Sequence, residues 1–244
     1  MKKTLIVTVL SFISYFGFGQ GNSGEVHYKV SAVASYDDYE ASKGPIYNEL
    51  KQGILSNIVN LDFLLQFNQT KSEFGLVKNL PLDMEDFHAK ITVDLSRGKS
   101  KFYTDFTKRA LLEQKEFLGE QFIIETPIEE FNWTLTNEQK KLKDFICYKA
   151  IGERTYQTKE LEIKKAEMIA WYCPEIPYAF GPFEAVGLPG LVMEFQVGNF
   201  IFSANELKLD KRNVEITPPK KGKLISLEEY NNILGKTAVG ETRY

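Results

Sequence analysis

The chain has 244 residues, of which 43% are hydrophobic and 26% charged, and 18 Phe, 12 Tyr and 2 Trp make it rich in aromatic side chains. This composition is typical of a globular protein and excludes a disordered or collagen-like chain. Its 30 basic residues are outnumbered by 33 acidic ones, so no global positive field exists to hold nucleic acid. We therefore expect no nucleic-acid partner.

The first twenty residues have the layout of a targeting segment. Lys2 and Lys3 precede an apolar run over residues 4–18, and a short stretch of Gly, Gln and Asn follows it. This order is typical of a cleaved signal peptide, and the run of about 15 residues is shorter than the ~20 that a membrane-anchoring helix needs. We expect residues 1–20 to be removed and residues 21–244 to form one domain in the periplasm or outside the cell, with no membrane-spanning segment.

The first half of the mature chain alternates between strand and helix patterns. Apolar residues at every second position from Val26 predict a strand, and Pro45 opens a segment with apolar residues at helical spacing. The elements expected here are a strand over 25–33, a helix over 45–58, a hairpin of 61–67 with 74–77, a loop over 78–87, and a hairpin of 89–94 with 101–106 around the turn 96–99.

The second half is predicted to be mostly extended. Gly198 and Asn199 form a tight two-residue connection, and Ser226 followed by Glu229 has the spacing of a helix capping box. The expected elements are strands over 121–125 and 132–135, one helical turn over 136–139, extended segments over 145–156 and 168–172 around a charged tip at 159–167, a hairpin of 191–197 with 200–207, and a helix over 227–234.

These patterns predict a fold that is mainly β with minor α. Ten or so strands linked in sequence by turns are typical of an antiparallel meander. A strongly curved antiparallel sheet or incomplete barrel, wrapped around the N-terminal helix at 45–58, would bury the many aromatic side chains.

Catalytic patterns are scarce in the sequence. The two histidines, His27 and His88, stand far apart, and neither belongs to a zinc-binding H-E-x-x-H motif. No nucleophile elbow, phosphate-binding loop or dinucleotide fingerprint is present. We therefore assign no catalytic, cofactor-binding or metal-binding residue.

Two cysteines, Cys147 and Cys173, form an even pair, which in an exported chain favours a disulfide. The alternative is two small buried hydrophobic residues. We predict that residues 145–151 and 169–173 pair as a hairpin with the two cysteines opposite each other and joined by a disulfide.

The most distinctive region is the segment 170–195, AWYCPEIPYAFGPFEAVGLPGLVMEF. Its prolines predict a fixed hydrophobic loop over 174–189, because proline cannot continue a helix or a central strand. Pro189 and Gly190 have the residue types of the two central positions of a type II turn over 188–191. Gly190 would then take a positive φ, so valine at Gly190 should cost more than alanine at Pro189.

This region resembles the GLPGLI family of exported proteins, which are found mainly in the Bacteroidetes. The resemblance rests on the motif at 187–192, in which Val192 stands for the usual Ile. Further agreement lies at Trp171-Tyr172 with Glu175-Ile176-Pro177, at Gly181-Pro182, at 147–150, at 63–68 and at 133–136. The stretch 183–186 departs from the family pattern. The resemblance implies an exported, β-rich envelope protein of undefined role, similar in fold to the half-barrel of lipoprotein carriers, with a groove for an apolar ligand.

Three functions remain open. The first is a non-catalytic binding module, in which the predicted loop covers an apolar groove for a lipid or an extended peptide. Its candidate binding residues are Trp171, Glu175, Tyr178, Phe180, Phe183, Leu188, Pro189 and Gly190. The second is an accessory subunit of an outer-membrane receptor or transport assembly. The third is an enzyme that uses Glu175 and Glu194. The alternative to all three is a structural role, in which these aromatic side chains close one end of the barrel. We expect about half of the aromatic side chains to have this role.

Overall fold

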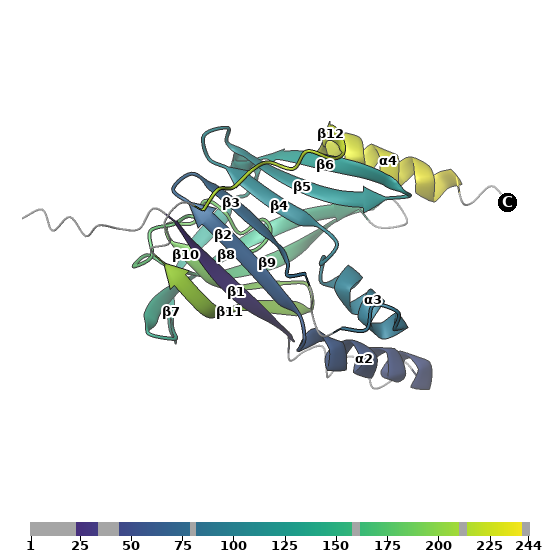
Figure 1. The fold of residues 1–244 in the computed structure, drawn as a ribbon, viewed down its shortest axis with the longest axis horizontal. Coiled ribbons are helices and arrows are strands. Elements are labelled where there is room, and N and C mark those ends of the chain that lie inside the picture. Colours follow the sequence, from purple (N-terminus) through teal and green to yellow (C-terminus); the bar gives the residue numbers. More distant parts are fainter. Residues whose placement is uncertain (1–22, 34–43, 79–81, 158–161, 210–213, 241–244) are drawn as a thin grey trace, which may run out of the picture.

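In the computed structural model, the described residues are 23–33, 44–78, 82–157, 162–209 and 214–240 (Figure 1). The predicted signal peptide over 1–20 lies outside them. No helix within these ranges is both long and apolar enough to cross a membrane.

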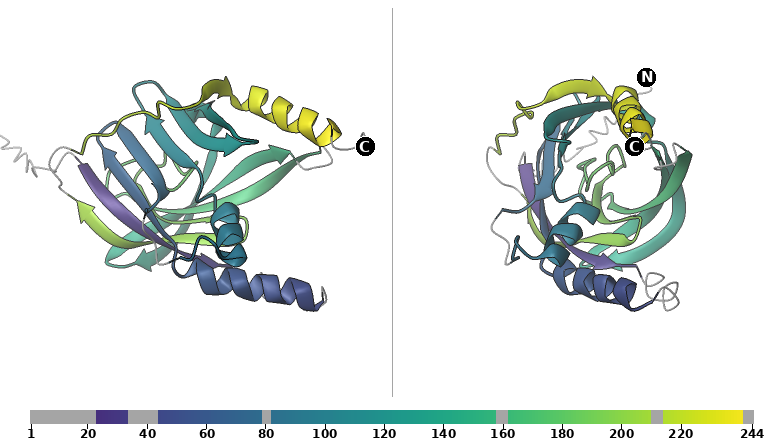
Figure 2. Two further views of the ribbon diagram at one scale, coloured as in Figure 1. Left: turned by 45° about the vertical axis from the view of Figure 1, so that its right-hand side comes forward. Right: turned by 90° about the vertical axis from the view of Figure 1, so that its right-hand side faces the viewer.

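In this described part of the chain, twelve strands form a single sheet that curls on itself without closing (Figures 1 and 2). The strands are β1 (Ser23–Ala32), β2 (Asp62–Asn68), β3 (Lys71–Leu76), β4 (Lys101–Asp105), β5 (Ala110–Phe117), β6 (Glu120–Pro127), β7 (Trp133–Leu142), β8 (Phe145–Gln157), β9 (Ile163–Cys173), β10 (Leu191–Val197), β11 (Phe200–Leu209) and β12 (Lys223–Ser226). The helices are α2 (Pro45–Ile58), α3 (Phe87–Leu95) and α4 (Leu227–Gly240), with a 3-10 turn at Ile128–Glu130. The predicted fold class, a strongly curved and mainly antiparallel sheet, is confirmed.

Two meanders meet at β1, which is the first strand along the chain and lies in the middle of the sheet. One runs from β2 to β6 and the other from β7 to β11, and β1 lies between them, hydrogen-bonded to both β2 and β11. The alternation predicted for β1 is correct, because Val26, Tyr28 and Val30 are buried. β12 adds to β6 in parallel, whereas the other pairs of described strands are antiparallel.

The N-terminal helix does not lie inside the curved sheet, as the sequence led us to expect. α2 packs beside α3 at one end of the sheet (Figures 1 and 2). Ile54 and Ile58 are buried, whereas Ile46 at its first turn is 83% exposed. A single amphipathic face suffices to dock a helix on a rim, and the interior is already filled by another segment of the chain.

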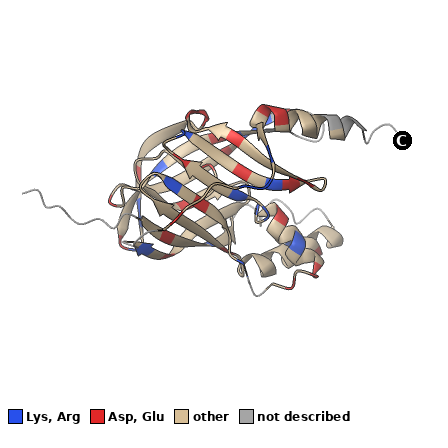
Figure 3. Cartoon of the chain, turned by 45° about the horizontal axis from the view of Figure 1, so that its top comes forward, with Lys and Arg blue, Asp and Glu red and all other residues tan. Residues whose placement is uncertain are grey.

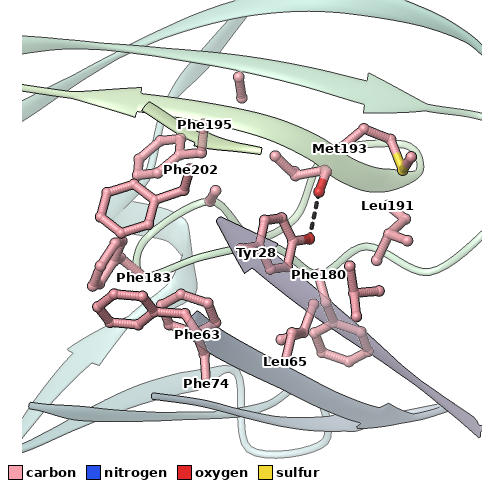
Figure 4. Close-up of a cluster of buried hydrophobic side chains, with 14 of the residues drawn as sticks. Tyr28, Phe63, Leu65, Phe74, Phe180, Phe183, Leu191, Met193, Phe195 and Phe202 are labelled. Carbon is pink, nitrogen blue, oxygen red and sulfur yellow. Dashed lines mark hydrogen bonds between the residues drawn. The ribbon is translucent and has the colours of Figure 1, made fainter. Parts of the chain in front are cut away.

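That segment is the loop between β9 and β10, which we call the plug loop (residues 174–190). Seven consecutive residues, 180–186, are buried inside the curl of the sheet. The ring of Phe183 contacts the rings of Phe74 and Phe202, each with its centroid 4.8 Å away (Figure 4). It also contacts the ring of Phe102, with the centroids 5.1 Å apart. Aromatic pairs at these separations stabilise a core beyond the area that they bury.

Burial of a loop requires partners for its backbone polar groups. The plug loop meets this need by local turns and by bonds to the sheet: Val192 N donates to Phe180 O at 3.0 Å and Gly187 N to Ala179 O at 3.0 Å. The Tyr28 hydroxyl donates to Val192 O at 2.5 Å (Figure 4). The loop is therefore an integral part of the core.

Three local predictions are wrong. Residues 89–94 form most of α3 instead of a strand, because the Asp86 side chain caps the helix by accepting from Ala89 N at 2.7 Å. The single helical turn expected at 136–139 lies within β7, at a register shift against β8. Residues 163–167, expected to lie at a charged tip, belong to β9 and pair with residues 153–157 of β8. Strands β5 and β12 have no counterpart among the predicted elements. Most residues of β5 are only partly buried and its pattern is largely polar.

The C-terminal segment forms a small unit of its own. Ser226 and Glu229 make the predicted capping box, with Ser226 N donating to the Glu229 carboxylate at 2.8 Å and Glu229 N to the Ser226 hydroxyl at 3.1 Å. α4 runs six residues beyond the predicted end at 234. Ile225 and Tyr230 pack with two residues of β6 in a cluster separate from the main core.

The cysteine pair is placed as predicted, but it is not bonded. β8 and β9 pair with Tyr148 opposite Tyr172, so the next positions, Cys147 and Cys173, also face each other. Both are buried free thiols, which corrects the predicted disulfide. Directly opposed Cβ atoms in a regular sheet lie about 4.5–5.5 Å apart, wider than the ~3.8 Å typical of a disulfide, so a bond would require the strands to draw together.

Both thiols should be unreactive in the folded protein. Burial, together with the neighbouring Cys173, raises the pKa of Cys147 to about 12 from a value of 9.0. Because only the thiolate is nucleophilic, we expect alkylation by iodoacetamide at pH 8 to be at least about a hundredfold slower in the native protein than in denaturant. Mass spectrometry of timed samples measures this. Thiols that stay unlabelled in denaturant until a reductant is added would show an oxidised pair instead.

Candidate functional site

Two cavities adjoin each other, and Arg97 and Arg154 line both of them. The helix cavity, of about 530 Å³, lies between β5, β6, β8 and α4. The rim cavity, of about 330 Å³, lies between the end of α3, strands β8 and β9, and the β10–β11 hairpin. Together we call them the cleft. Their volumes fall within or near the 300–1,000 Å³ that ligand sites commonly have.

A buried ion network separates the two cavities. Arg97 donates to the Glu184 carboxylate at 2.8 Å and to the Glu113 carboxylate at 3.3 Å. Ser100 donates to the second oxygen of Glu113 at 2.8 Å, and the Lys115 ammonium lies 3.4 Å from that oxygen. The side chains of Arg97 and Glu184 are only 19% and 10% exposed. Buried charges of this kind are held only when paired and hydrogen-bonded.

Two residues at the ion network have strained backbone angles. Among the described residues, five other than glycine have positive φ, and three of them, Arg109, Leu118 and Lys143, lie in tight turns between adjacent strands. The other two are Arg97, with φ of 60°, and Phe183, with φ of 53°. The Arg97 guanidinium lies 4.8 Å from the centre of the Phe183 ring. Strained residues persist only where the surroundings enforce them, and they cluster at functional sites.

The electrostatics of the network keep its acid ionised. Burial alone would raise the pKa of Glu184, but the charge of Arg97, their hydrogen bond and the charge of Arg154 together hold that pKa below its usual value. Burial likewise opposes the charge of Arg97, and the two glutamates outweigh it, so the pKa of Arg97 is raised. Glu184 is therefore not suited to donate a proton at neutral pH.

The candidate binding residues taken from the sequence do not line the cleft as a group. Phe180, Phe183 and Leu188 are buried in the core, and of these only Phe183 lines a cavity. Trp171 is partly exposed beneath the Lys140 ammonium, which lies 4.2 Å from its ring. The remaining members differ in exposure: Glu175 and Pro189 are exposed, Tyr178 is partly buried, and Gly190 is buried.

The motif turn differs from the predicted type II turn. Gly190 has the expected positive φ, 149°. However, Gly190 N donates to Leu188 O at 2.8 Å, which is the three-residue bond of a γ-turn centred on Pro189. Leu191 N cannot close the predicted four-residue turn because it donates to Ile176 O at 2.9 Å.

The two carboxylates considered for an enzyme have separate partners. Glu175 is exposed and accepts from Ile146 N at 3.4 Å. Glu194 accepts from Lys140 at 2.5 Å and from Ser203 at 3.3 Å. Within the described residues, no three potential metal ligands gather.

Sequence reasoning missed the network of Arg97, Glu113 and Glu184. Glu113 is 16 positions from Arg97 along the chain and Glu184 is 87 positions from it, so no local motif joins the three residues. One signal was available: Glu184 is the only charged residue between Phe180 and Val186, and a charge within an apolar loop needs a partner.

One segment of the chain matches a known protein family. Residues 152–194 match the model of a family described as a protein of unknown function, Porph_ging. The match covers β8 from Gly152 onward, β9, the plug loop and the start of β10. No curated protein matches the sequence.

Among solved structures, the chain resembles PNGF-II, determined in two crystal forms. The C2 form aligns with a TM-score of 0.50 and the P21 form with 0.51, each at 12% sequence identity. The alignments cover 89% and 88% of this chain but only 33% and 34% of the PNGF-II chains. The chain thus spans about a third of the length of these structures, and the likeness shows the fold alone.

Proposed function

We propose that the protein is an exported member of the GLPGLI family and a non-catalytic binding module of the cell envelope, which takes an apolar ligand in the cleft. The match over 152–194 includes the motif that gives the family its name. The observation that carries the proposal is a pair of adjoining cavities, of about 530 and 330 Å³, beside the buried plug loop. The plug loop is then the floor of the site instead of its lid.

The lining of the rim cavity, the less charged half of the cleft, fits an amphipathic ligand, either a lipid or an extended peptide. Apolar side chains supply most of the rim cavity: Leu95, Ala166, Phe183, Val197, Phe200 and Phe202. Polar side chains are few there and converge on the ion network. Sites of this composition bind by burial of apolar surface and use the polar groups for orientation.

A neutral fluorescent probe tests this proposal. N-phenyl-1-naphthylamine should bind the purified mature protein saturably, with an increase in its emission. Leu95 lines the rim cavity and is 52% exposed, so Leu95→Glu should place a charge on the cavity wall without disturbing the core. We expect this variant to weaken probe binding about tenfold or more, since a charge in an apolar site is costly.

Leu118→Glu provides the matched control. Leu118 is 72% exposed at the turn between β5 and β6 and lines neither cavity. It should bind the probe as the unmodified protein does. Absence of saturable binding, or equal weakening by both variants, would contradict the proposal.

A second function is favoured by a separate observation. Exposed apolar side chains gather on and beside helices α2 and α3: Ile46, Val59, Met84, Phe87 and Leu95. Apolar surface of this kind can mark a contact with another protein, as an accessory subunit of an outer-membrane assembly would need. The probe experiment separates the two, because an accessory subunit requires no saturable binding in the cleft.

A further inference from the structure

The two halves of the cleft differ in charge. The helix cavity is lined by five glutamates, Glu113, Glu116, Glu130, Glu153 and Glu184, against three basic residues, Arg97, Lys115 and Arg154. The rim cavity is lined by two charged residues only, and both are arginines. An anionic group is therefore disfavoured on the helix side of the network and favoured on the rim side.

The arginines are placed to receive such a group. Arg154 on β8 faces Ala166 across the β8–β9 pair, and both residues line the rim cavity. The bonds of Arg97 to Glu184 and Glu113 use two of the five N–H donors that a guanidinium has. A guanidinium is the donor best matched to a carboxylate.

Apart from Ser96 and Asn199, the rest of the rim cavity is apolar, and the cavity is small. Leu95 and Phe200 belong to its wall, and Val197 and Gly198 lie at the tip of the β10–β11 hairpin. A volume of about 330 Å³ is at the low end of the range for ligand sites, which favours a small ligand over a bulky one.

We propose that the rim cavity selects a carboxylic acid with an alkyl chain, whose head binds at Arg97 and Arg154 and whose chain lies along Leu95 and Phe200. This inference rests on the proposed function, because it names the ligand class of the same cleft. The backbone strain at Arg97 and Phe183 is consistent with it, since both residues line the cavity.

Displacement of N-phenyl-1-naphthylamine by three ten-carbon probes tests the inference. Decanoate, decanol and decylamine share the chain and differ in the head. We expect decanoate to displace the probe at a concentration about tenfold or more below the other two, which is the scale of one charge-assisted hydrogen bond. Arg154→Gln should abolish this preference and leave decanol unchanged, and Arg154→Lys should keep part of it.

Arg109→Gln is the control for a general loss of positive charge. The Arg109 side chain is 73% exposed and lies outside both cavities, so the preference for decanoate should persist. Equal displacement by all three probes would overturn this inference while leaving the proposed function intact. Tighter binding of decylamine, or of the carboxylate peptide N-acetyl-trileucine, would also overturn it. A protein that does not bind the naphthylamine at all would contradict the proposed function itself.

Discussion

Gly190→Ala should lower the free energy of unfolding by about 3–5 kcal/mol, a large share of the ~5–15 kcal/mol that a typical domain has. An added Cβ would lie 2.1 Å from the carbonyl oxygen of Cys173 and 2.8 Å from the nitrogen of Pro174. Both are backbone atoms, so the clash cannot be relieved by rotating a side chain. The φ of 149° adds about 1–3 kcal/mol for a residue other than glycine.

Two variants separate the close approach from the backbone angle. Gly198 has φ of 57° with no atom within 4 Å of an added Cβ, so Gly198→Ala should cost only about 1 kcal/mol. Pro189→Ala should cost about 0.4–1 kcal/mol, through the entropy of the unfolded chain. Urea midpoints of the three variants measure this order. Equal midpoints for Gly190→Ala and Gly198→Ala would show that the approach to Cys173 is not maintained in solution.

Glu184→Gln should be the most costly substitution in the ion network, at about 2–4 kcal/mol. Removal of one partner of a buried pair commonly costs ~3–5 kcal/mol, and here Arg97 keeps Glu113 as a second partner. Glu129→Gln provides the control, because the pair of Arg109 with Glu129 is exposed, and its urea midpoint should not change.

The same network makes stability depend on pH in acid. The pKa of Glu184 in the folded protein lies below its value of 4.5 for a free side chain. The stability that the ionised Glu184 carboxylate contributes is therefore fully present above about pH 4.5. It is lost as the pH falls through the lower pKa of the folded protein. We expect the unfolding free energy of the unmodified protein to decline in this range and that of Glu184→Gln to decline less. Parallel curves for the two proteins would refute the assignment.

The elements that sequence patterns predicted correctly are those decided by local chemistry. Pro45 starts a helix because its fixed φ suits the first turn. Ser226 and Glu229 satisfy each other's backbone amides, and Gly198 accepts the left-handed angle of a tight turn. Each of these local structures is decided by residues within a few positions of one another, so a single sequence is enough to predict it.

The errors arise where distant residues decide. The β-branched Ile91, Thr92 and Val93 favour a strand by propensity, but the Asp86 cap and packing against α2 make this segment a helix. The plug loop was recognised as fixed and apolar, yet its location inside the sheet depends on partners such as Phe74 and Phe202. The cleft could not be predicted, because its lining residues come from α3, β5, β6, β8, β9, β10, β11, α4 and the loops.

Basic and acidic residues are interleaved along the strands and helices in the view of Figure 3. These charges are therefore balanced locally. The ion network of Arg97 differs because it lies within the cleft, where water does not screen it fully.

The central position of β1 sets the order in which the chain can complete its fold. Val30 pairs with Phe202, about 170 residues later, so this pairing forms only after β11 has been synthesised. Until then the second edge of β1 has no partner, although β2 can cover the first. Contacts between such distant residues are slow to form, and an unpaired strand edge invites association with other chains. Assembly of the whole sheet should therefore be a late, rate-limiting event. Until β11 has been synthesised, the incomplete chain needs protection from aggregation.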